Sequence, residues 1–265
     1  MSLTFIILGC GSSMGVPRVA LGWGQCDPNN PKNRRRRCSL LVERANTQGH
    51  VTRVLVDCSP DLRAQLLDAE VDWLDGVLIT HQHADHTHGI DDLRPLFVRQ
   101  RQRVPVYMDE PTSRAMHAHF GYCFRSPSGS QYPPILSEHR LVPGQAVSID
   151  GQGGSIDVLP ILQDHGDIPS LGFRFGNVAY SADIKSLPPA SVDQMAGLDV
   201  WIVDALRKSP HPSHMNLEEA LVWIARIKPK RAILTNLHAE LDFEELRAQV
   251  PPGVEPAYDR MSFAG

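Results

Sequence analysis

Short runs of apolar residues, separated by turn-forming residues, recur along the whole chain. Runs of this length that are rich in Val, Ile and Leu and bounded by Gly, Pro, Asn or Asp are typical of β-strands. The pattern predicts strands at Leu3 to Leu8, Ser39 to Glu43, Val54 to Asp57, Gly76 to Thr80, Val104 to Met108, Ile156 to Leu159, Gly172 to Phe175, Val178 to Ser181, Val200 to Asp204 and Ala232 to Thr235.

Helical periodicity is rarer than strand periodicity. Strands dominate the first half of the chain and alternate with helices in the second, and this order favours two sheets packed face to face with helices outside. We expect residues 1-265 to form a single domain, since no low-complexity linker divides them. The segment Gly121 to Gly144, rich in Pro, Ser and Gly, is expected to be a long loop over the functional site. The predicted helices are Asp61 to Glu70, Asp91 to Arg99, Thr112 to Phe120, Leu217 to Ile227 and Phe243 to Ala248.

Metal-ligand side chains gather directly after the predicted strand that ends at Thr80. They are His81, His83, Asp85 and His86. We expect the first two to turn toward one point and the last two toward a second, so that two nearby cations can bind. A polar loop of solvated histidines is the plain alternative, but it does not explain why four ligand-type side chains gather at one strand end.

Three further ligand candidates follow later strands. His165 comes after the strand predicted to end at Leu159, Asp183 follows Ser181, and His238 follows Thr235. A two-metal site needs another nitrogen ligand and a bridging carboxylate, and these residues supply both types.

Composition and charge indicate the kind of protein that carries this site. The chain has 265 residues, of which 42% are hydrophobic and 21% charged, with a formal net charge of -4. We find no apolar stretch long enough to span a bilayer and expect a cytoplasmic protein. The five cysteines form no CxxC pair, so reduced thiols fit best. The basic run Arg34 to Arg37 is interpreted first as a solvated approach to a strand, and second as a phosphate contact.

The order HxHxDH, His, Asp, His resembles the metallo-beta-lactamase fold superfamily over nearly the whole chain. Two further segments are similar to one branch: Gly9 to Pro17, and Ser213 to Ala220 before a late helix. That branch contains the phosphoribosyl cyclic phosphate phosphodiesterase of phosphonate breakdown and, more distantly, the ribonucleases that trim the 3′ end of tRNA. The resemblance implies a four-layer αββα sandwich with the site at one edge of the sheets.

The resemblance also implies a ligand set. In it, His81, His83 and His165 hold one metal, while Asp85, His86 and His238 hold the other and Asp183 bridges the two.

Two positions depart from the family pattern. Relatives commonly place the last histidine directly after the strand-ending Thr, where this chain has Asn236. His238 comes two residues later and would lie on the same side of an extended segment. Cys26 stands nearly alone where the phosphonate-pathway enzyme has a cysteine cluster that holds a structural zinc, so no such site is expected here.

Phosphodiester hydrolysis is the chemistry that two adjacent cations and these residues favour. The cations, Zn²⁺ or Mn²⁺, would activate a shared water, which Asp85 could help to orient. His214 is the candidate general acid for the leaving group, although helix capping is the alternative role. Asp204 could orient the His214 imidazole and Arg207 could clamp a phosphate oxygen, or the two could form a structural ion pair.

Other functions remain open from the sequence alone. An acyl-type hydrolase of thioesters or lactones would use the same metals, and a nuclease or tRNA-processing enzyme is another alternative. The acidic net charge and the lack of a lysine-rich arm disfavour a long nucleic acid. The expected substrate is a small phosphodiester, such as a cyclic ribose phosphate or a nucleotide. A binding scaffold that has lost catalysis is the alternative from a different class of function. A homodimer is expected by analogy.

Overall fold

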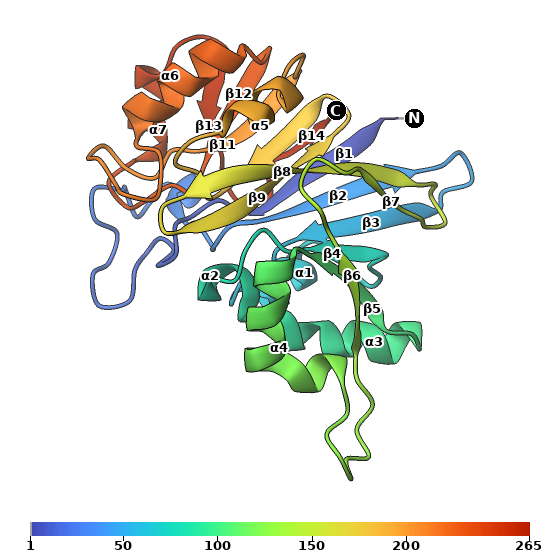
Figure 1. The fold of residues 1–265 in the computed structure, drawn as a ribbon. Helices are drawn as coiled ribbons and strands as arrows, with labels where there is room; N and C mark the ends of the chain where they lie inside the picture. The colour runs from blue at the N-terminus through green and yellow to red at the C-terminus, as the bar shows by residue number, and fades with distance from the viewer. Residues whose placement is uncertain (1) are drawn as a thin grey trace.

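The computed structural model describes residues 2–265 as two sheets that face each other, with helices on both outer surfaces (Figure 1). Each sheet has seven strands. The four-layer αββα arrangement expected from the sequence is therefore confirmed.

The first sheet combines an antiparallel half with a parallel half. Strand β1 pairs antiparallel with β14 and β2, and β2 pairs antiparallel with β3, whereas the pairs from β3 to β6 are parallel. In spatial order the strands are β14 (Ser262–Ala264), β1 (Leu3–Gly9), β2 (Ser39–Ala45), β3 (Val51–Val56), β4 (Gly76–Leu78), β5 (Val104–Met108) and β6 (Leu136–Arg140).

The second sheet has the same mixed character. Its pairs from β7 to β10 are antiparallel, and those from β10 to β13 are parallel. In spatial order the strands are β13 (Val254–Pro256), β12 (Arg231–Thr235), β11 (Val200–Asp204), β10 (Val178–Ser181), β9 (Ile168–Phe175), β8 (Ile156–His165) and β7 (Val147–Ile149).

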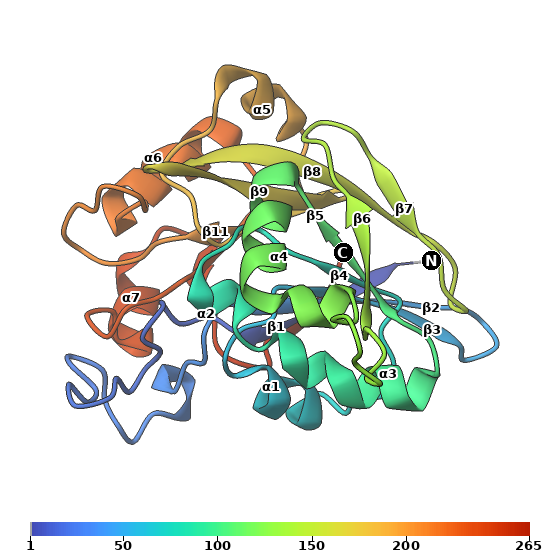
Figure 2. The same cartoon turned by 60° about the horizontal axis from the view of Figure 1, so that its bottom comes forward.

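Helices form the two outer layers. Figure 2 shows α4 lying across the first sheet, with α1 and α3 beside it. The α-helices are α1 (Leu62–Asp68), α2 (Ala84–Thr87), α3 (Arg94–Gln100), α4 (Glu110–Phe124), α5 (Pro189–Gln194), α6 (Leu217–Ile227) and α7 (Phe243–Gln249), with short 3-10 helices η1 (Pro31–Asn33) and η2 (Ile90–Leu93).

The apolar runs are continuous because both faces of each sheet are covered. In β2, Leu40 packs in the core between the sheets, whereas its neighbour Leu41 packs under the helices of the first sheet. Successive side chains of a strand point to opposite faces, so a strand buried on both faces must be apolar at every position. Trp201 of β11 packs in the corresponding core under α5, α6 and α7.

The strand directions bring several chain segments to one edge. The parallel strands β3 and β4 end side by side, as do β10, β11 and β12. Strand β8 is antiparallel to β9, and β9 is antiparallel to β10, so β8 also ends at the edge where β10 ends.

Several boundaries differ from the sequence predictions, and two of these differences matter for the site. Strand β8 continues to His165 instead of ending at Leu159, because its residues from Leu159 to His165 pair with β9. The expectation of one long loop from Gly121 to Gly144 is wrong, since its start belongs to α4 and residues 136–140 form β6. The segment between α4 and β6, residues 125–135, projects at the bottom of Figure 1, away from α2.

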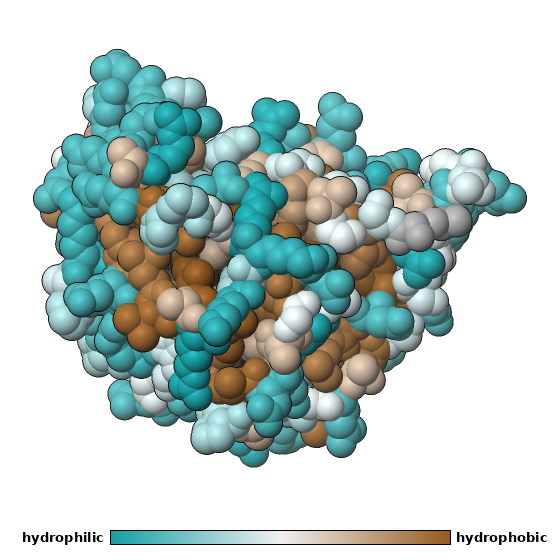
Figure 3. Space-filling model, turned by 90° about the horizontal axis from the view of Figure 1, so that it is seen from above, coloured by the Kyte–Doolittle hydropathy of each residue, from teal (hydrophilic) through white to brown (hydrophobic). Residues whose placement is uncertain are grey.

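The surface, the helices and the cysteines can each be compared with the expectations from the sequence. On the face in Figure 3, exposed apolar side chains form patches that polar side chains divide. Within residues 2–265, every helix is too short or too polar to cross a bilayer. The five cysteines are all buried and free, as expected.

Gly89 provides a test of how tightly the segment after α2 packs. A Cβ at this position would lie 2.0 Å from the Ser59 carbonyl oxygen and 2.8 Å from Leu62 Cβ. We expect Gly89→Ala to lower the free energy of unfolding by about 1–3 kcal/mol or more in urea denaturation, because this backbone cannot move aside freely. Gly121→Ala is the control, since a Cβ there meets nothing within 4 Å and should be neutral or slightly stabilising. Equal stability of both variants would contradict the packing described.

Candidate metal centre

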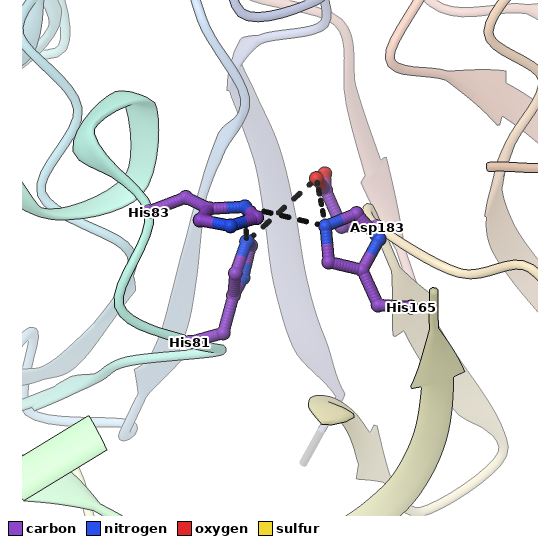
Figure 4. A group of neighbouring side chains, drawn as sticks. All are labelled: His81, His83, His165 and Asp183. Atoms are coloured by element: carbon purple, nitrogen blue, oxygen red, sulfur yellow. Dashed lines mark hydrogen bonds and ion pairs between the residues drawn. The ribbon is translucent and has the colours of Figure 1, made fainter. Parts of the chain in front are cut away.

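Three histidines and one aspartate converge between the two sheets. His81 and His83 follow β4, His165 ends β8, and Asp183 follows β10. Figure 4 shows the His81 and His83 rings facing His165 and the Asp183 carboxylate. One ligand atom from each of the four residues lies within 4.8 Å of the others.

The nitrogens of this group lie close enough to need a cation or a proton between them. His83 Nδ1 is 2.9 Å from His81 Nε2 and 3.3 Å from His165 Nε2. Asp183 Oδ2 lies 3.8 Å from His81 Nε2 and 3.5 Å from His165 Nε2. Three imidazole nitrogens and one carboxylate oxygen form a donor set that suits zinc and its neighbours. The residues present therefore fit a divalent metal ion.

A second group shares the same aspartate. His86 Nε2 lies 3.4 Å from Asp85 Oδ2 and 3.2 Å from Asp183 Oδ1. The two oxygens of Asp183 thus face different groups, Oδ2 the first and Oδ1 the second. This is the arrangement expected of a bridging carboxylate.

Asp57 is a fully buried carboxylate that the sequence reasoning did not assign to the site. Its Oδ2 is 2.6 Å from His86 Nδ1, so it fixes the ring with Nε2 toward Asp85 and Asp183. Thr80 donates its backbone and hydroxyl hydrogens to Asp57. Asp57 immediately follows β3, next to β4, so its place at the end of a buried strand was the signal available in the sequence.

His165 is oriented by the segment that precedes α6. The backbone oxygen of Ser213 is 2.8 Å from His165 Nδ1, which leaves Nε2 facing His83 and Asp183. A histidine that ligates a metal commonly donates its second ring hydrogen to such an oxygen.

Burial and neighbouring charges set the protonation of the first group. Burial lowers the pKa of His81 and of His165, although the Asp183 carboxylate opposes this change in both. The neutral imidazole is the form that binds metal. Burial alone would raise the pKa of Asp183, but His86 and the other nearby imidazoles outweigh it and hold that pKa well below its usual range.

His214 lies beside this centre and pairs with a buried aspartate. Its Nδ1 is 2.7 Å from Asp204 Oδ2, and its Nε2 is 3.7 Å from Asp183 Oδ2. Burial disfavours the charged ring, but the Asp204 and Asp183 carboxylates outweigh this and raise the pKa of His214 to about 9. Burial also raises the pKa of Asp204, to about 7, although contact with His214 acts in the opposite direction. The pair therefore keeps a proton on the imidazole at neutral pH.

Backbone hydrogen bonds hold His214 in place. The neighbouring Met215 donates its backbone hydrogen to Ile184 and accepts one from Leu206. Helix α6 begins three residues after His214, and Asn216 and Glu219 form its capping box. Asn216, and not His214, is the capping residue, so the alternative of a capping histidine is wrong.

His238 is the predicted ligand that the structure does not bring to either group. The expectation that Asn236 and His238 share one side of an extended segment is wrong, because Asn236 has a left-handed backbone with φ of 60°. His238 Nε2 instead lies 3.2 Å from Arg18 Nη1. The Asn236 amide adjoins the centre, with Nδ2 3.2 Å from Asp183 Oδ1 and 3.1 Å from the Ala182 oxygen.

The proposed ion pair of Arg207 with Asp204 is absent from the described part of the chain. Asp204 pairs with His214, whereas Arg207 donates to the backbone oxygens of Ser209 and Pro210. The two residues therefore act separately, and the structural ion pair considered from the sequence is excluded.

The basic run Arg34 to Arg37 is mostly engaged within the protein. Arg36 pairs with Asp68 and Asp259, and Arg37 pairs with Asp61. Arg34 lies over the Trp23 ring at 5.1 Å. The interpretation of the run as a solvated approach to a strand is wrong for Arg35, which is buried.

A cavity of about 180 Å³ opens beside the second group. Asp85, His214 and Asn236 line it on the side of the centre. The other residues that line it are Ser12, Ser13, Met14, Leu206, Arg207, His211 and His238.

Comparisons with known sequences place the chain in a family. A family model described as the beta-lactamase superfamily domain matches residues 52–236. A Porphyromonas gingivalis protein named octanoyltransferase is 32% identical over 259 residues, covering 96% of this chain and 50% of that protein. Ribonuclease Z from Bradyrhizobium diazoefficiens is 33% identical over 185 residues, covering 67% of this chain and 50% of that protein. The chain thus spans about half the length of these curated relatives.

Solved structures extend the likeness to the whole fold. A structure described as a new diphosphatase from the PhnP family is 34% identical with a TM-score of 0.88, covering 100% of this chain and 98% of that chain. The zinc-bound PqqB of Methylobacterium extorquens, 15% identical with a TM-score of 0.74, covers 98% of this chain and 99% of that chain and shares the fold. The chain therefore belongs to the beta-lactamase superfamily, in the branch that includes the PhnP family.

Proposed function

We propose that this protein is a metal-dependent phosphodiesterase that hydrolyses a small phosphodiester, such as a cyclic one. The observation that carries the proposal is His214, an imidazole that Asp204 holds at 2.7 Å at the edge of the two ligand groups. Hydrolysis of an ester with a poor leaving group needs such an acid. The similarity to a protein described as a diphosphatase supports chemistry at phosphorus.

Two divalent cations would be held by residues from both sheets. His81, His83, His165 and Asp183 would hold the first, while Asp85, His86 and Asp183 would hold the second. When bound, such ions make water nucleophilic at neutral pH and neutralise charge on a phosphoryl group. Zinc and manganese both suit these ligands.

The chain's own residues position the reacting groups. Asp57 and the Ser213 oxygen orient His86 and His165. Asp85 would also accept a hydrogen bond from the attacking water. The His214 Nε2 hydrogen would pass to the leaving oxygen, and the Asp204 carboxylate would keep the ring in that orientation.

Ribonuclease activity is the second candidate, because ribonuclease Z proteins are among the relatives. The ion pairs of Arg36 and Arg37 argue against it, since they neutralise two of the four arginines of this basic run that could contact a long polyanion. The relative named octanoyltransferase supports an acyl reaction only weakly, because this chain spans 50% of that protein.

Hydrolysis assays test the proposal directly. Chelated protein is reconstituted in turn with Zn²⁺ and Mn²⁺ and given bis(para-nitrophenyl) phosphate, a panel of cyclic phosphates, a precursor tRNA and a thioester. We expect metal-dependent turnover of the small phosphodiesters. Turnover of the tRNA or the thioester alone, with metal bound, would contradict the proposal in favour of the corresponding alternative.

Asp183→Ala tests the bridging role. Removing the carboxylate shared by both groups should release metal from one or both positions and abolish phosphodiester hydrolysis together. Elemental analysis of purified protein measures the metal content. Asp167→Ala, which changes an exposed aspartate in the turn after His165, should retain both metal and activity. Unchanged metal content in Asp183→Ala would refute the bridge.

His214→Ala tests the general acid. The variant should retain its metal but slow hydrolysis of an alkyl phosphodiester by roughly 10²- to 10⁴-fold. An aryl ester such as bis(para-nitrophenyl) phosphate should slow much less, because its leaving group needs little protonation. His119→Ala, at an exposed position on α4, is the control. Equal slowing of the alkyl and aryl esters would exclude the acid role.

A further inference from the structure

The residues that follow Asp183 join it to the end of β8. Lys185 donates its backbone hydrogen to the Asp164 oxygen at 2.7 Å, and Asp164 directly precedes the ligand His165. Asp164 donates its own backbone hydrogen to the Ser186 oxygen at 3.0 Å, and the Ser186 hydroxyl donates to the Asp164 carboxylate at 2.6 Å. The backbone of Lys185 is therefore held beside two ligand residues, Asp183 and His165.

The side chain of Lys185 reaches the segment that carries His214. Its Nζ lies 2.6 Å from Glu219 Oε1 and 3.4 Å from the His214 carbonyl oxygen. A lysine ammonium group has three hydrogens to donate, so it can bond to both oxygens at once. The half-buried Lys185 side chain thus links the segment after β10 to the segment before α6.

Glu219 uses its second carboxylate oxygen to cap α6. Its Oε2 accepts the backbone hydrogen of Asn216 at 2.9 Å, and its own backbone hydrogen is donated to Asn216 Oδ1 at 2.8 Å. Burial disfavours charge on Glu219, but its bonds to Lys185 and to the Asn216 backbone outweigh burial and lower the pKa of the carboxyl group. The ion pair with Lys185 therefore fixes the carboxylate that holds the backbone two residues after His214.

Lys185 can act on the reaction only through these oxygen atoms, because it neither lines the cavity nor belongs to a ligand group. The Asp204 carboxylate holds the His214 ring at Nδ1, whereas Lys185 holds the same residue by its backbone. Proton transfer depends steeply on the positions of donor and acceptor, and a displacement of about 1 Å can slow a reaction about 100-fold. The backbone support is therefore expected to matter for the rate.

We propose that Lys185 is a positioning residue for the general acid, whose ion pair with Glu219 and bond to the His214 oxygen hold the His214 ring beside Asp183. Because Asp183 and Lys185 belong to one short segment, this link fixes the separation of the acid from the bridging carboxylate. That separation is 3.7 Å from His214 Nε2 to Asp183 Oδ2. The kinetic consequence rests on the proposed function, whereas the link between the two segments does not.

Two variants of Lys185 and a matched control test the link. Lys185→Met removes the charge and the donors but keeps an unbranched apolar side chain. Lys185→Arg keeps the charge and can still donate to Glu219. Lys230→Met is the control, because Lys230 forms a similar ion pair with Asp199, at 2.7 Å, and neither residue lines the cavity or belongs to a ligand group.

The first arm measures hydrolysis by the metal-loaded enzyme. Lys185→Met should retain its metal and lower kcat for an alkyl phosphodiester about 10- to 100-fold, with KM near the wild-type value. Bis(para-nitrophenyl) phosphate should slow much less, because its leaving group needs little protonation. Lys185→Arg should recover most of the alkyl rate, and Lys230→Met should match the wild type. Equal slowing of both esters, or no recovery with arginine, would overturn the positioning role.

A double-mutant cycle asks whether Lys185 and Glu219 act as one unit. Glu219→Gln removes the charge but keeps an oxygen that can cap α6. If the two residues form one support for His214, the double variant should hydrolyse the alkyl ester no more slowly than Lys185→Met alone. Additive slowing would show that they act separately and would contradict the proposal.

The last arm needs no activity. Hydrogen exchange of the Met215 and Glu219 backbone amides is followed by NMR in metal-free protein, since these amides bond to Ile184 and Asn216 across and beside the link. Lys185→Met should speed exchange at both amides several-fold, and Lys230→Met should leave it unchanged. Unchanged exchange in Lys185→Met would overturn the link. If exchange changed as expected but the wild type hydrolysed no phosphodiester, the proposed function would fail and the link would stand.

Discussion

The buried carboxylate of Asp183 is the interaction on which the rest of the site depends. Its side chain is 4% exposed. Its Oδ2 faces His81 from the other sheet and His165 from its own sheet, and its Oδ1 faces His86 from the other sheet. A buried carboxylate is costly unless it is paired with charge or coordinates metal. His81, His86 and His165 surround it. Asn236, which follows β12, donates to it. Asp183 therefore ties the two sheets together at the point where metal ions would sit.

The sheet topology explains why such a site can form at all. Strands β3 and β4 of one sheet and β8, β10 and β12 of the other end at one edge, so residues far apart in sequence meet there. Each ligand also has its own support. Asp57 orients His86, Ser213 orients His165, and Asp204 orients His214. These supports fix the imidazoles before any cation arrives, which is the preorganisation that metal sites require.

The sequence predicted most of the fold because its signals were local. Strands buried on both faces are continuous apolar runs, so β5, β10 and β11 were predicted at their observed bounds. Helix α6 was also predicted at its observed bounds, because its amphipathic pattern is clear and Asn216 caps it. The short edge strand β7 was missed because three residues carry little periodicity. Strand β6 was missed because its Ser, Glu, His and Arg side chains are polar.

The site residues that the sequence predicted correctly were likewise those with a local signal. His81, His83, Asp85 and His86 stand in one motif, and the structure brings them together with His165 and Asp183. The place of His238 could not be predicted, since it depends on the left-handed backbone of Asn236 and on Arg18 from the other end of the chain. Asp57 was missed because its role appears only when β3 and β4 pair. The single domain and the homodimer stay predictions.

Anomalous scattering from crystals grown with Mn²⁺ or Zn²⁺ tests the central claim most directly. A site bridged by Asp183 predicts two peaks about 3.5 to 4 Å apart, one beside His81, His83 and His165 and the other beside Asp85 and His86. A single peak at only one of these groups, or no peak at either, would contradict the two-metal centre.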